Sequence, residues 1–238
     1  MQHEIERKYL ECERMGIFLV LMMAGGFMGS YTYLLRGGVF CNAQTSNILL
    51  FGLALGEGNW GRAAYLLIPI SAYLAGSVGS EILPVYVRKA EILRWDTLLL
   101  LIEMLVLIFL GLLPERAPVQ ISQVAINFIC SMQYNTFRQA QGIPMATTFC
   151  TNHLRQTGIY IAKWIRKKDP KAPRRTLRHA EMIGMFVAGA FIGTLCCRLF
   201  SGRAIWGAAL LIGFAFFDLL RADLTKEKGK LYQKPAGH

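Results

Sequence analysis

Long apolar runs, separated by short polar and charged stretches, recur along the whole chain. Six of them approach the roughly 20 residues that a helix needs to cross about 30 Å of hydrocarbon. Because most charged residues lie between these runs, the pattern predicts an all-α integral membrane protein with about six transmembrane helices. The predicted spans cover residues 17–35, 63–83, 97–113, 119–137, 182–199 and 204–220.

Two further stretches are apolar over only part of their length. Residues 39–56 open with a polar run, and only residues 48–56 after it are apolar, too few to span at 1.5 Å per residue. Residues 143–165 likewise open with polar side chains and carry Lys163 near their end. Broken backbone is tolerated at membrane depth only where protein or water surrounds it. We therefore expect re-entrant half-helices, the alternative being segments that lie at the membrane interface.

The distribution of Lys and Arg distinguishes six spans from eight. With six spans, 21 of the 26 basic residues fall on the side that holds both termini. With eight spans this asymmetry weakens. The positive-inside rule therefore favours six spans with cytoplasmic termini. The same clustering argues against nucleic acid as the partner of this basic chain.

The two halves of the chain share a faint similarity. The sequence TSNI at 45–48 can be aligned with TNHL at 151–154, and YLAG at 73–76 with FVAG at 186–189. Three spans in each half would give the halves opposite orientations, as in the inverted repeats of many transporters. We therefore expect one transmembrane domain over 1–238, with half-repeats 1–117 and 118–221 and a basic cytoplasmic tail at 222–238.

The composition supports a membrane protein, and the spacing of the cysteines gives no sign of a metal or cofactor site. Hydrophobic residues make up 54% of the chain and charged residues 17%, against about 25% charged in soluble domains. The six cysteines show no Cys-x-x-Cys pair and no spacing suited to zinc. Residues 1–14 are charged and lack the apolar stretch of a cleavable signal. We expect no metal site and no cofactor.

Four sequence blocks resemble a known family. They are GGFMGSYTY at 25–33, GGVFCNAQTSN at 37–47, MQYNTFR at 132–138 and ATTFCTNHLR at 146–155. At these residues the chain resembles the YoaK-like family of bacterial membrane proteins, known as domain of unknown function 1275. The resemblance implies a multi-pass protein of the bacterial cytoplasmic (inner) membrane, and it implies no particular activity.

Polar side chains at membrane depth are the main candidates for a binding site. Amides and hydroxyls are costly in hydrocarbon unless they meet partners, water or a solute, and the N-terminus of a half-helix attracts anions and carbonyl groups. The candidate substrate-binding residues are Asn42, Gln44, Thr45, Ser46, Asn47, Gln133, Asn135, Thr147, Thr148, Thr151 and Asn152.

Each group of candidates also has a purely structural interpretation. Thr45 or Ser46 could simply cap a helix. The residues around His153 would also suit a surface helix among lipid headgroups. Gln133 and Asn135 could serve hydrogen bonding between helices.

Glu103 lies near the middle of the third predicted span. A carboxylate there must be protonated, paired or hydrated, because burying its charge costs several kcal/mol. We interpret it as a proton-coupling candidate, the alternative being a neutral acid that is hydrogen-bonded to a neighbouring helix.

These observations favour a transporter or channel for a small polar or anionic solute, with the lipid bilayer as its main partner. A homo-oligomer is compatible with the sequence. The alternatives are a membrane scaffold or regulatory protein and, less favoured, a membrane-embedded enzyme. No set of nucleophile, base and orienting group emerges, so we predict no catalytic residues and no enzyme activity.

Overall fold

The computed structural model describes residues 9–90 and 92–235, and helices dominate it. The α-helices are α2 (Met15–Leu35), α3 (Gln44–Gly56), α4 (Trp60–Ala90), α5 (Trp95–Leu112), α6 (Val119–Thr136), α7 (Thr151–Lys167), α8 (Ala172–Phe200) and α9 (Trp206–Leu224). Short 3-10 helices are η1 (Glu11–Glu13), η2 (Ser201–Ile205) and η3 (Lys228–Lys230). A small antiparallel hairpin pairs β1 (Gln139–Ala140) with β2 (Ile143–Pro144).

The all-α prediction is confirmed, except for this hairpin, which the sequence analysis did not foresee. Each of the six predicted spans corresponds to a helix, α2, α4, α5, α6, α8 or α9, and three of them extend one or two residues beyond it. By length and apolar composition, four helical stretches are able to cross a membrane: Met15–Leu35, Trp60–Lys89, Trp95–Leu112 and Ala172–Leu224. The last stretch contains both α8 and α9, whereas α6, which glutamine, serine and asparagine interrupt, is not among the four.

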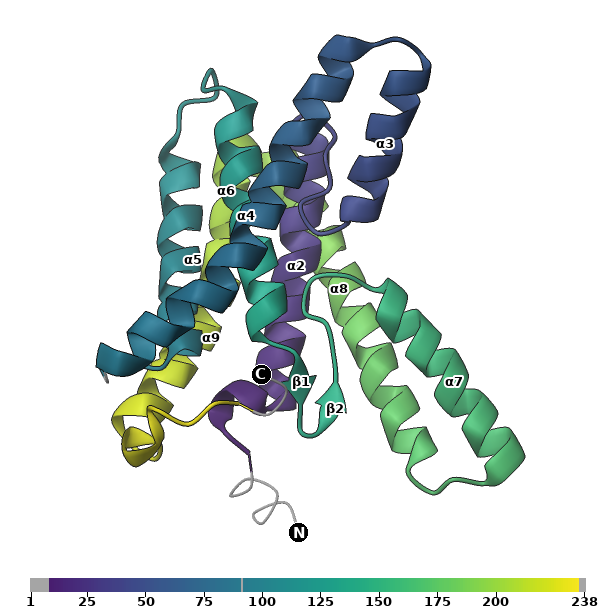
Figure 1. Ribbon diagram of the computed structural model, residues 1–238, viewed down its shortest axis with the longest axis vertical. Helices are drawn as coiled ribbons and strands as arrows, with labels where there is room; N and C mark the ends of the chain where they lie inside the picture. Colours follow the sequence, from purple (N-terminus) through teal and green to yellow (C-terminus); the bar gives the residue numbers. More distant parts are fainter. Residues whose placement is uncertain (1–8, 91, 236–238) are drawn as a thin grey trace.

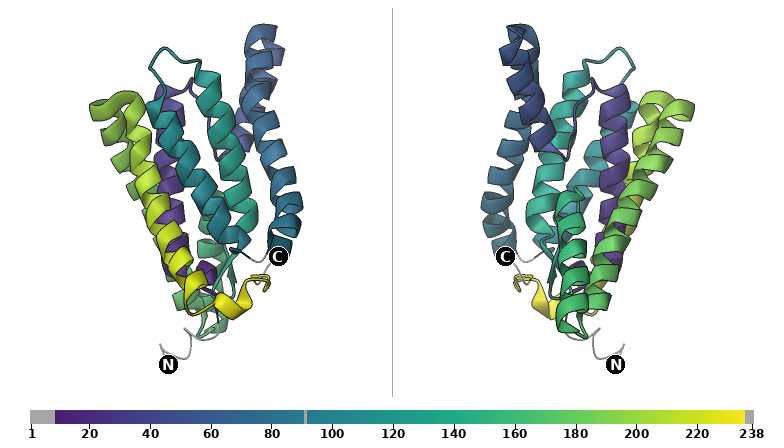
Figure 2. Two further views of the ribbon diagram at one scale, coloured as in Figure 1. Left: turned by 90° about the vertical axis from the view of Figure 1, so that its left-hand side faces the viewer. Right: turned by 90° about the vertical axis from the view of Figure 1, so that its right-hand side faces the viewer.

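The helices form an elongated bundle in which α2 lies near the centre (Figure 1). Helix α2 packs against α8, α4 against α6, and α5 against α9. The two shorter helices form hairpins with their successors, α3 with α4 and α7 with α8. Figure 1 shows α3 toward one end of the bundle and α7 toward the other, while α2 and α6 run in opposite directions. Figure 2 shows α3 and α4 on one flank and α8 and α9 on the other.

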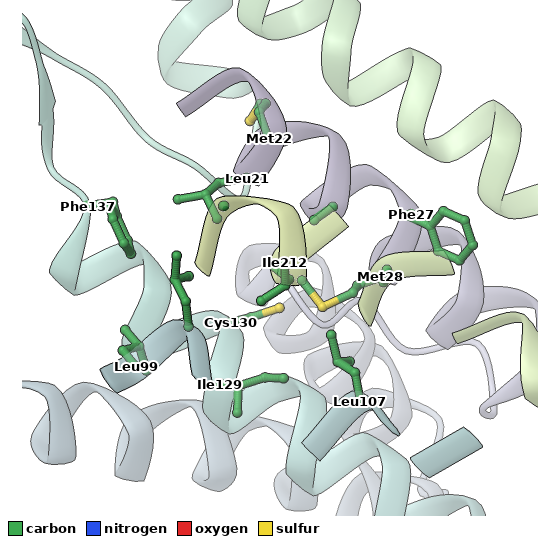
Figure 3. Close-up of a cluster of buried hydrophobic side chains, with 14 of the residues drawn as sticks. Leu21, Met22, Phe27, Met28, Leu99, Leu107, Ile129, Cys130, Phe137 and Ile212 are labelled. Carbon is green, nitrogen blue, oxygen red and sulfur yellow. The ribbon is translucent and has the colours of Figure 1, made fainter. Parts of the chain in front are cut away.

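The buried core is built from apolar faces of α2, α5, α6 and α9. Met28, Cys130 and Ile212 are completely buried and come together from three of these helices (Figure 3). Leu99 and Leu107 of α5 complete the same cluster. Burial of this kind is the main source of close packing between the central helices.

Glycines allow two of the helix pairs to approach at backbone distance. A Cβ atom added to Gly26 of α2 would collide with the carbonyl oxygen of Phe186 on α8, and one on Gly189 of α8 would collide with that of Met23. In the α4–α6 pair, a Cβ on Gly76 would collide with the carbonyl oxygen of Phe128. Only glycine permits such contacts, which are typical of helix packing in membranes.

The outer faces of the helices remain strongly apolar. Large exposed side chains include Leu74 of α4, Phe109 of α5, Phe191 of α8 and Leu210 of α9. Apolar side chains exposed in this number on long helices indicate contact with lipid rather than with water. The chain is therefore a membrane protein.

Candidate functional site

The first break segment, residues 37–47, joins α2 to α3 and includes the first turn of α3. Helix α3 begins at Gln44, so the predicted half-helix of residues 48–56 is four residues too short. Its N-cap is Ala43, and no side chain caps it. The interpretation of Thr45 or Ser46 as the cap is therefore wrong. The backbone turns into the helix through the bond from the Ser46 amide to the carbonyl oxygen of Ala43, 3.0 Å long.

Most amide side chains of the first break segment have protein partners. Asn47, completely buried, accepts from the Phe40 amide at 3.1 Å and donates to the Phe40 carbonyl oxygen at 2.7 Å and to Gln44 Oε1 at 3.0 Å. Gln44 in turn donates to Asn127 Oδ1 at 2.7 Å. Thr45 is exposed and Ser46 half-buried. Asn47 thus fixes the loop, and Gln44 ties it to α6.

The second break segment, residues 145–152, joins β2 to α7 and has a different character. Thr147 and Thr148 are completely buried. Within the described part of the chain, neither hydroxyl oxygen has a hydrogen-bond partner. The other two candidates lie outward, since Thr151 is exposed and Asn152 accepts a hydrogen bond from exposed Arg155 at 3.0 Å. The two buried threonines are therefore the polar groups here that are able to bind something else.

His153 holds the second break segment in place, a role that the sequence analysis missed. Its Nε2 lies 2.9 Å from the carbonyl oxygen of Ala146, and its Nδ1 lies 3.0 Å from Nδ1 of His179 on α8. Because a carbonyl oxygen only accepts, the proton of His153 is on Nε2, and His179 Nδ1 donates to His153 Nδ1. Only His153 and Tyr160 of α7 are buried, so this helix is exposed over most of its length while the His153 side chain faces the protein.

The two break segments meet α2 at one glycine. Asn42 Nδ2 donates to the carbonyl oxygen of Gly25 at 3.1 Å. From the other side, a Cβ atom added to Gly25 would lie 3.0 Å from the carbonyl oxygen of Thr147 and 3.3 Å from the Cα of Thr148. Gly25 lies near the middle of α2, and Figure 1 shows both segments reaching the helix there. Both polar stretches thus approach Gly25 of α2, the first through Asn42 and the second through Thr147 and Thr148.

Two candidates on α6 have different surroundings. Asn135 donates to Ser80 Oγ of α4 at 3.0 Å, so the interpretation as a bond between helices is confirmed for this residue. Gln133 is completely buried, and among the described residues neither its amide nitrogen nor its oxygen has a partner. Interhelical hydrogen bonding is therefore wrong for Gln133, which stays an unpartnered amide inside the bundle.

Glu103 of α5 is also completely buried, and within the described ranges both its carboxyl oxygens lack a hydrogen-bond partner. The alternative interpretation, in which Glu103 is hydrogen-bonded to a neighbouring helix, is therefore wrong. Glu103 lies within electrostatic range of Cys130 of α6, which in turn neighbours Cys41 in the first break segment.

The structure also adds two polar residues of α6 that the sequence analysis did not select. Gln123 Nε2 donates to the carbonyl oxygen of Arg36 at 2.6 Å, and Asn127 Nδ2 donates to that of Gln123 at 2.8 Å. Polar residues at four-residue spacing in an apolar helix are the signal that could have identified them.

Five clefts in the described part of the chain have linings that include neither Asn47 nor Asn152. Residues 9–90 and 92–235 contain no group of three or more His, Cys, Asp or Glu that could hold a metal ion. Around Gly25 the site offers the polar side chains of Asn42, Thr147 and Thr148, and Glu103 and Gln133 are further buried polar groups of the bundle.

Comparison with known proteins gives one match. The family model described as protein of unknown function (DUF1275) matches residues 17–217. No curated protein and no solved structure matches the chain.

Proposed function

The chain belongs to the DUF1275 family, and from this premise we propose that it is a multi-pass membrane transporter or channel for a small polar or anionic solute. The family description states no activity, so the argument depends on the site. The observation that carries the proposal is the meeting of two broken segments at Gly25, beside the buried and unpartnered hydroxyls of Thr147 and Thr148. Broken backbone beside unpaired polar groups is how many transporters build their solute sites.

In this proposal the two halves form an inverted repeat with six spans, α2, α4 and α5 followed by α6, α8 and α9. Three observations support it. Helices α2 and α6 run in opposite directions. The α2–α8 contact has its counterpart in the α6–α4 contact. Gly76 and Gly189, which the weak internal similarity aligns, both approach a carbonyl oxygen of the other half, that of Phe128 and of Met23.

The same proposal makes α3 and α7 re-entrant, with both termini in the cytoplasm. It is supported by the basic residues, most of which lie in segments at the end of the bundle that holds η1 and the β-hairpin. The location in the cytoplasmic membrane follows from this orientation and from the resemblance to bacterial proteins.

Glu103 would supply the coupling proton. A buried carboxylate without a partner is costly when charged, so gain and loss of its proton would be linked to the polarity of the site. This role is supported by the position of Glu103 within electrostatic range of Cys130, which neighbours Cys41 of the first break segment. Because the polar groups are enclosed, the conformation described above corresponds to the closed state of such a transporter.

The test is solute flux into proteoliposomes, with glycerol, urea, acetate and nitrate as probes in an osmotic swelling assay. Thr147→Val and Thr148→Val remove only the unpartnered hydroxyls and conserve shape, so the variants should stay folded. The control is Thr194→Val, whose hydroxyl donates to the carbonyl oxygen of Ala190 on its own helix. We expect loss of about tenfold or more in flux of one probe for the first two variants and none for the control.

The second candidate is a membrane scaffold without a solute. It is favoured by the linings of the five clefts, which include neither Asn47 nor Asn152, and by the internal partners of Asn47. Lack of flux for all four probes, with unchanged folding of all three variants, would favour the scaffold. A membrane-embedded enzyme has no comparable observation in its support.

A further inference from the structure

Two adjoining clefts are lined by residues of η1, the β-hairpin and the start of α8. Figure 1 shows the β-hairpin and the start of α8 at the same end of the bundle. The volumes of the two clefts are about 490 and 560 Å³. They extend between the start of α2, the turn of the hairpin and the first turns of α8. The residues that line both clefts are Tyr9, Met15, Gln141, Arg174 and Arg178. We call the combined space the headgroup cleft.

The headgroup cleft is strongly positive. Five basic and two acidic side chains line it: Arg14, Lys171, Arg174, Arg175 and Arg178 against Glu11 and Asp218. Glu11 forms ion pairs with Arg14, at 3.2 Å, and with Lys226. The positive charge of this cleft is therefore only partly compensated by its own acidic residues.

Two of its basic side chains have no partner in the part of the chain that the structure describes. Arg178 is paired with Glu181 at 2.8 Å, and Arg175 donates to Tyr160 Oη at 3.2 Å. No ion pair, side-chain hydrogen bond or ring contact involves Arg174 or the ammonium group of Lys171 among residues 9–90 and 92–235. Both side chains are exposed and are therefore free to bind an anion.

The headgroup cleft also has an apolar wall. Ile17 and Val20 of α2 and Phe214 of α9 line the cleft of 490 Å³ together with Arg174 and Arg178. Phe214 lies on the outer, apolar face of α9, with 67% of its surface exposed. The cleft is thus basic around the start of α8 and apolar further along α2 and α9, which is the amphipathic order of a phospholipid.

We propose that the headgroup cleft binds one anionic phospholipid, with its phosphodiester oxygens at Arg174 and Lys171 and an acyl chain along Val20 and Phe214. Guanidinium and ammonium groups bind phosphate oxygens through charge-assisted hydrogen bonds, and such contacts gain strength beside an anionic membrane surface. A water-soluble phosphate ester would satisfy the basic residues and leave the apolar wall uncovered. This site is separate from Gly25 and does not depend on the transport proposal.

Native mass spectrometry of the full chain in neutral detergent tests this site. The ligands are dioleoyl phosphatidylglycerol, dioleoyl phosphatidylcholine and soluble glycerol phosphate. The cleft variant is Lys171→Gln with Arg174→Gln. The matched control, Arg166→Gln with Lys167→Gln, removes the same charge from exposed residues in the last turn of α7, outside the cleft.

We expect the wild-type chain to bind phosphatidylglycerol about tenfold more tightly than phosphatidylcholine, and the cleft variant to lose this preference. The control should retain the preference to within about twofold. Equal loss in both variants would overturn the proposal in favour of diffuse charge attraction, and equal binding of the two lipids would overturn it outright. Tight binding of soluble glycerol phosphate that displaces the lipid would assign the cleft to a water-soluble phosphate ester instead.

Discussion

The two break segments resemble each other in sequence, yet their polar groups are in opposite states. In the first, the Asn47 amide is hydrogen-bonded to the backbone of Phe40 and to Gln44, and Asn42 is hydrogen-bonded to the backbone of α2. In the second, Thr147 and Thr148 are just as deeply buried, and their hydroxyl oxygens have no partner in the described chain. One segment is thus fixed by its own side chains, whereas the other is fixed from outside by His153.

This difference shows that polar sequence at membrane depth has two separate uses. A satisfied amide network rigidifies the backbone, whereas unpaired hydroxyls cost free energy that a structural role alone does not explain. The first segment therefore acts as scaffold, and the second is the better place for a solute. Four experiments, taken from the largest expected effect to the smallest, test this division.

The largest effect is expected for Asn47→Ala. The change leaves the amide of Phe40 unpaired and its carbonyl oxygen with only the longer bond of 3.4 Å from Gln44 Nε2, which should lower the free energy of unfolding by about 3 kcal/mol. Reversible unfolding in mixed SDS micelles measures it. Ser46→Ala is the control, because Ser46 is half-buried and forms no side-chain hydrogen bond in the described chain, and it should stay within about 0.5 kcal/mol of wild type. Equal stability of the two variants would remove the scaffold role of Asn47.

A matched pair of glycines on α2 tests the contact of this helix with each segment. Gly25→Ala places a methyl group 3.0 Å from the Thr147 carbonyl oxygen, which is backbone and moves little, and should cost about 2 kcal/mol. In Gly29→Ala the nearest atom is the side-chain nitrogen of Asn42 at 3.2 Å, and the gain in helix propensity offsets part of the strain. Its stability should change by less than about 1 kcal/mol. The same unfolding assay measures both variants. A larger loss of stability in Gly29→Ala than in Gly25→Ala would contradict a rigid contact between the second break segment and α2.

Removal of the Thr147 and Thr148 hydroxyls should change the free energy of unfolding in the opposite direction from removal of a hydrogen-bonded hydroxyl. Thr147→Val and Thr148→Val each remove a buried oxygen without a partner, so the free energy of unfolding should rise by up to about 1 kcal/mol. Thr32→Val deletes a hydroxyl that donates to the carbonyl oxygen of Met28 at 3.1 Å. This change should lower the free energy of unfolding by about 1 kcal/mol. Destabilisation by all three changes would mean that Thr147 and Thr148 have ordinary structural partners.

The smallest perturbation is a label on single-cysteine variants. Cys41 in the first segment is completely buried, whereas Cys150 in the second is only partly buried. Maleimide should therefore modify Cys150 at a measurable rate and leave Cys41 unmodified until the protein unfolds. Mass spectrometry of the intact chain reports both. Rapid modification of Cys41 would show that the first segment opens readily and does not act as a fixed scaffold.

Much of the fold could be predicted from the sequence because hydrophobic periodicity and charge placement are local signals. All six predicted spans correspond to helices to within two residues at the ends that extend beyond them, and the two ambiguous stretches form shorter helices preceded by breaks. The start of α3 was placed too late because its first turn, from Gln44 to Asn47, is polar and the apolar run begins only at Ile48. The β-hairpin was missed because each of its strands has only two residues.

The site could be predicted only in part. Eleven candidate residues share polarity and depth, and sequence carries no information on which amide already has a partner. Gln44 was selected for a solute, yet it binds Asn127, which lies 83 positions later. For His153 the sequence suggested only that its neighbours would also suit a surface helix, because its partners, Ala146 and His179, are determined by tertiary structure.

The exchange of partners between the halves constrains the order of biogenesis. Helix α2 leaves the ribosome early, but the groove at Met23 that receives Gly189 is filled only when α8 has been synthesised. Until α8 is in place, this face of α2 must be covered by a chaperone, by lipid or by the insertion machinery. The first half therefore does not complete its assembly during its own translation, and the last helices to emerge close the bundle.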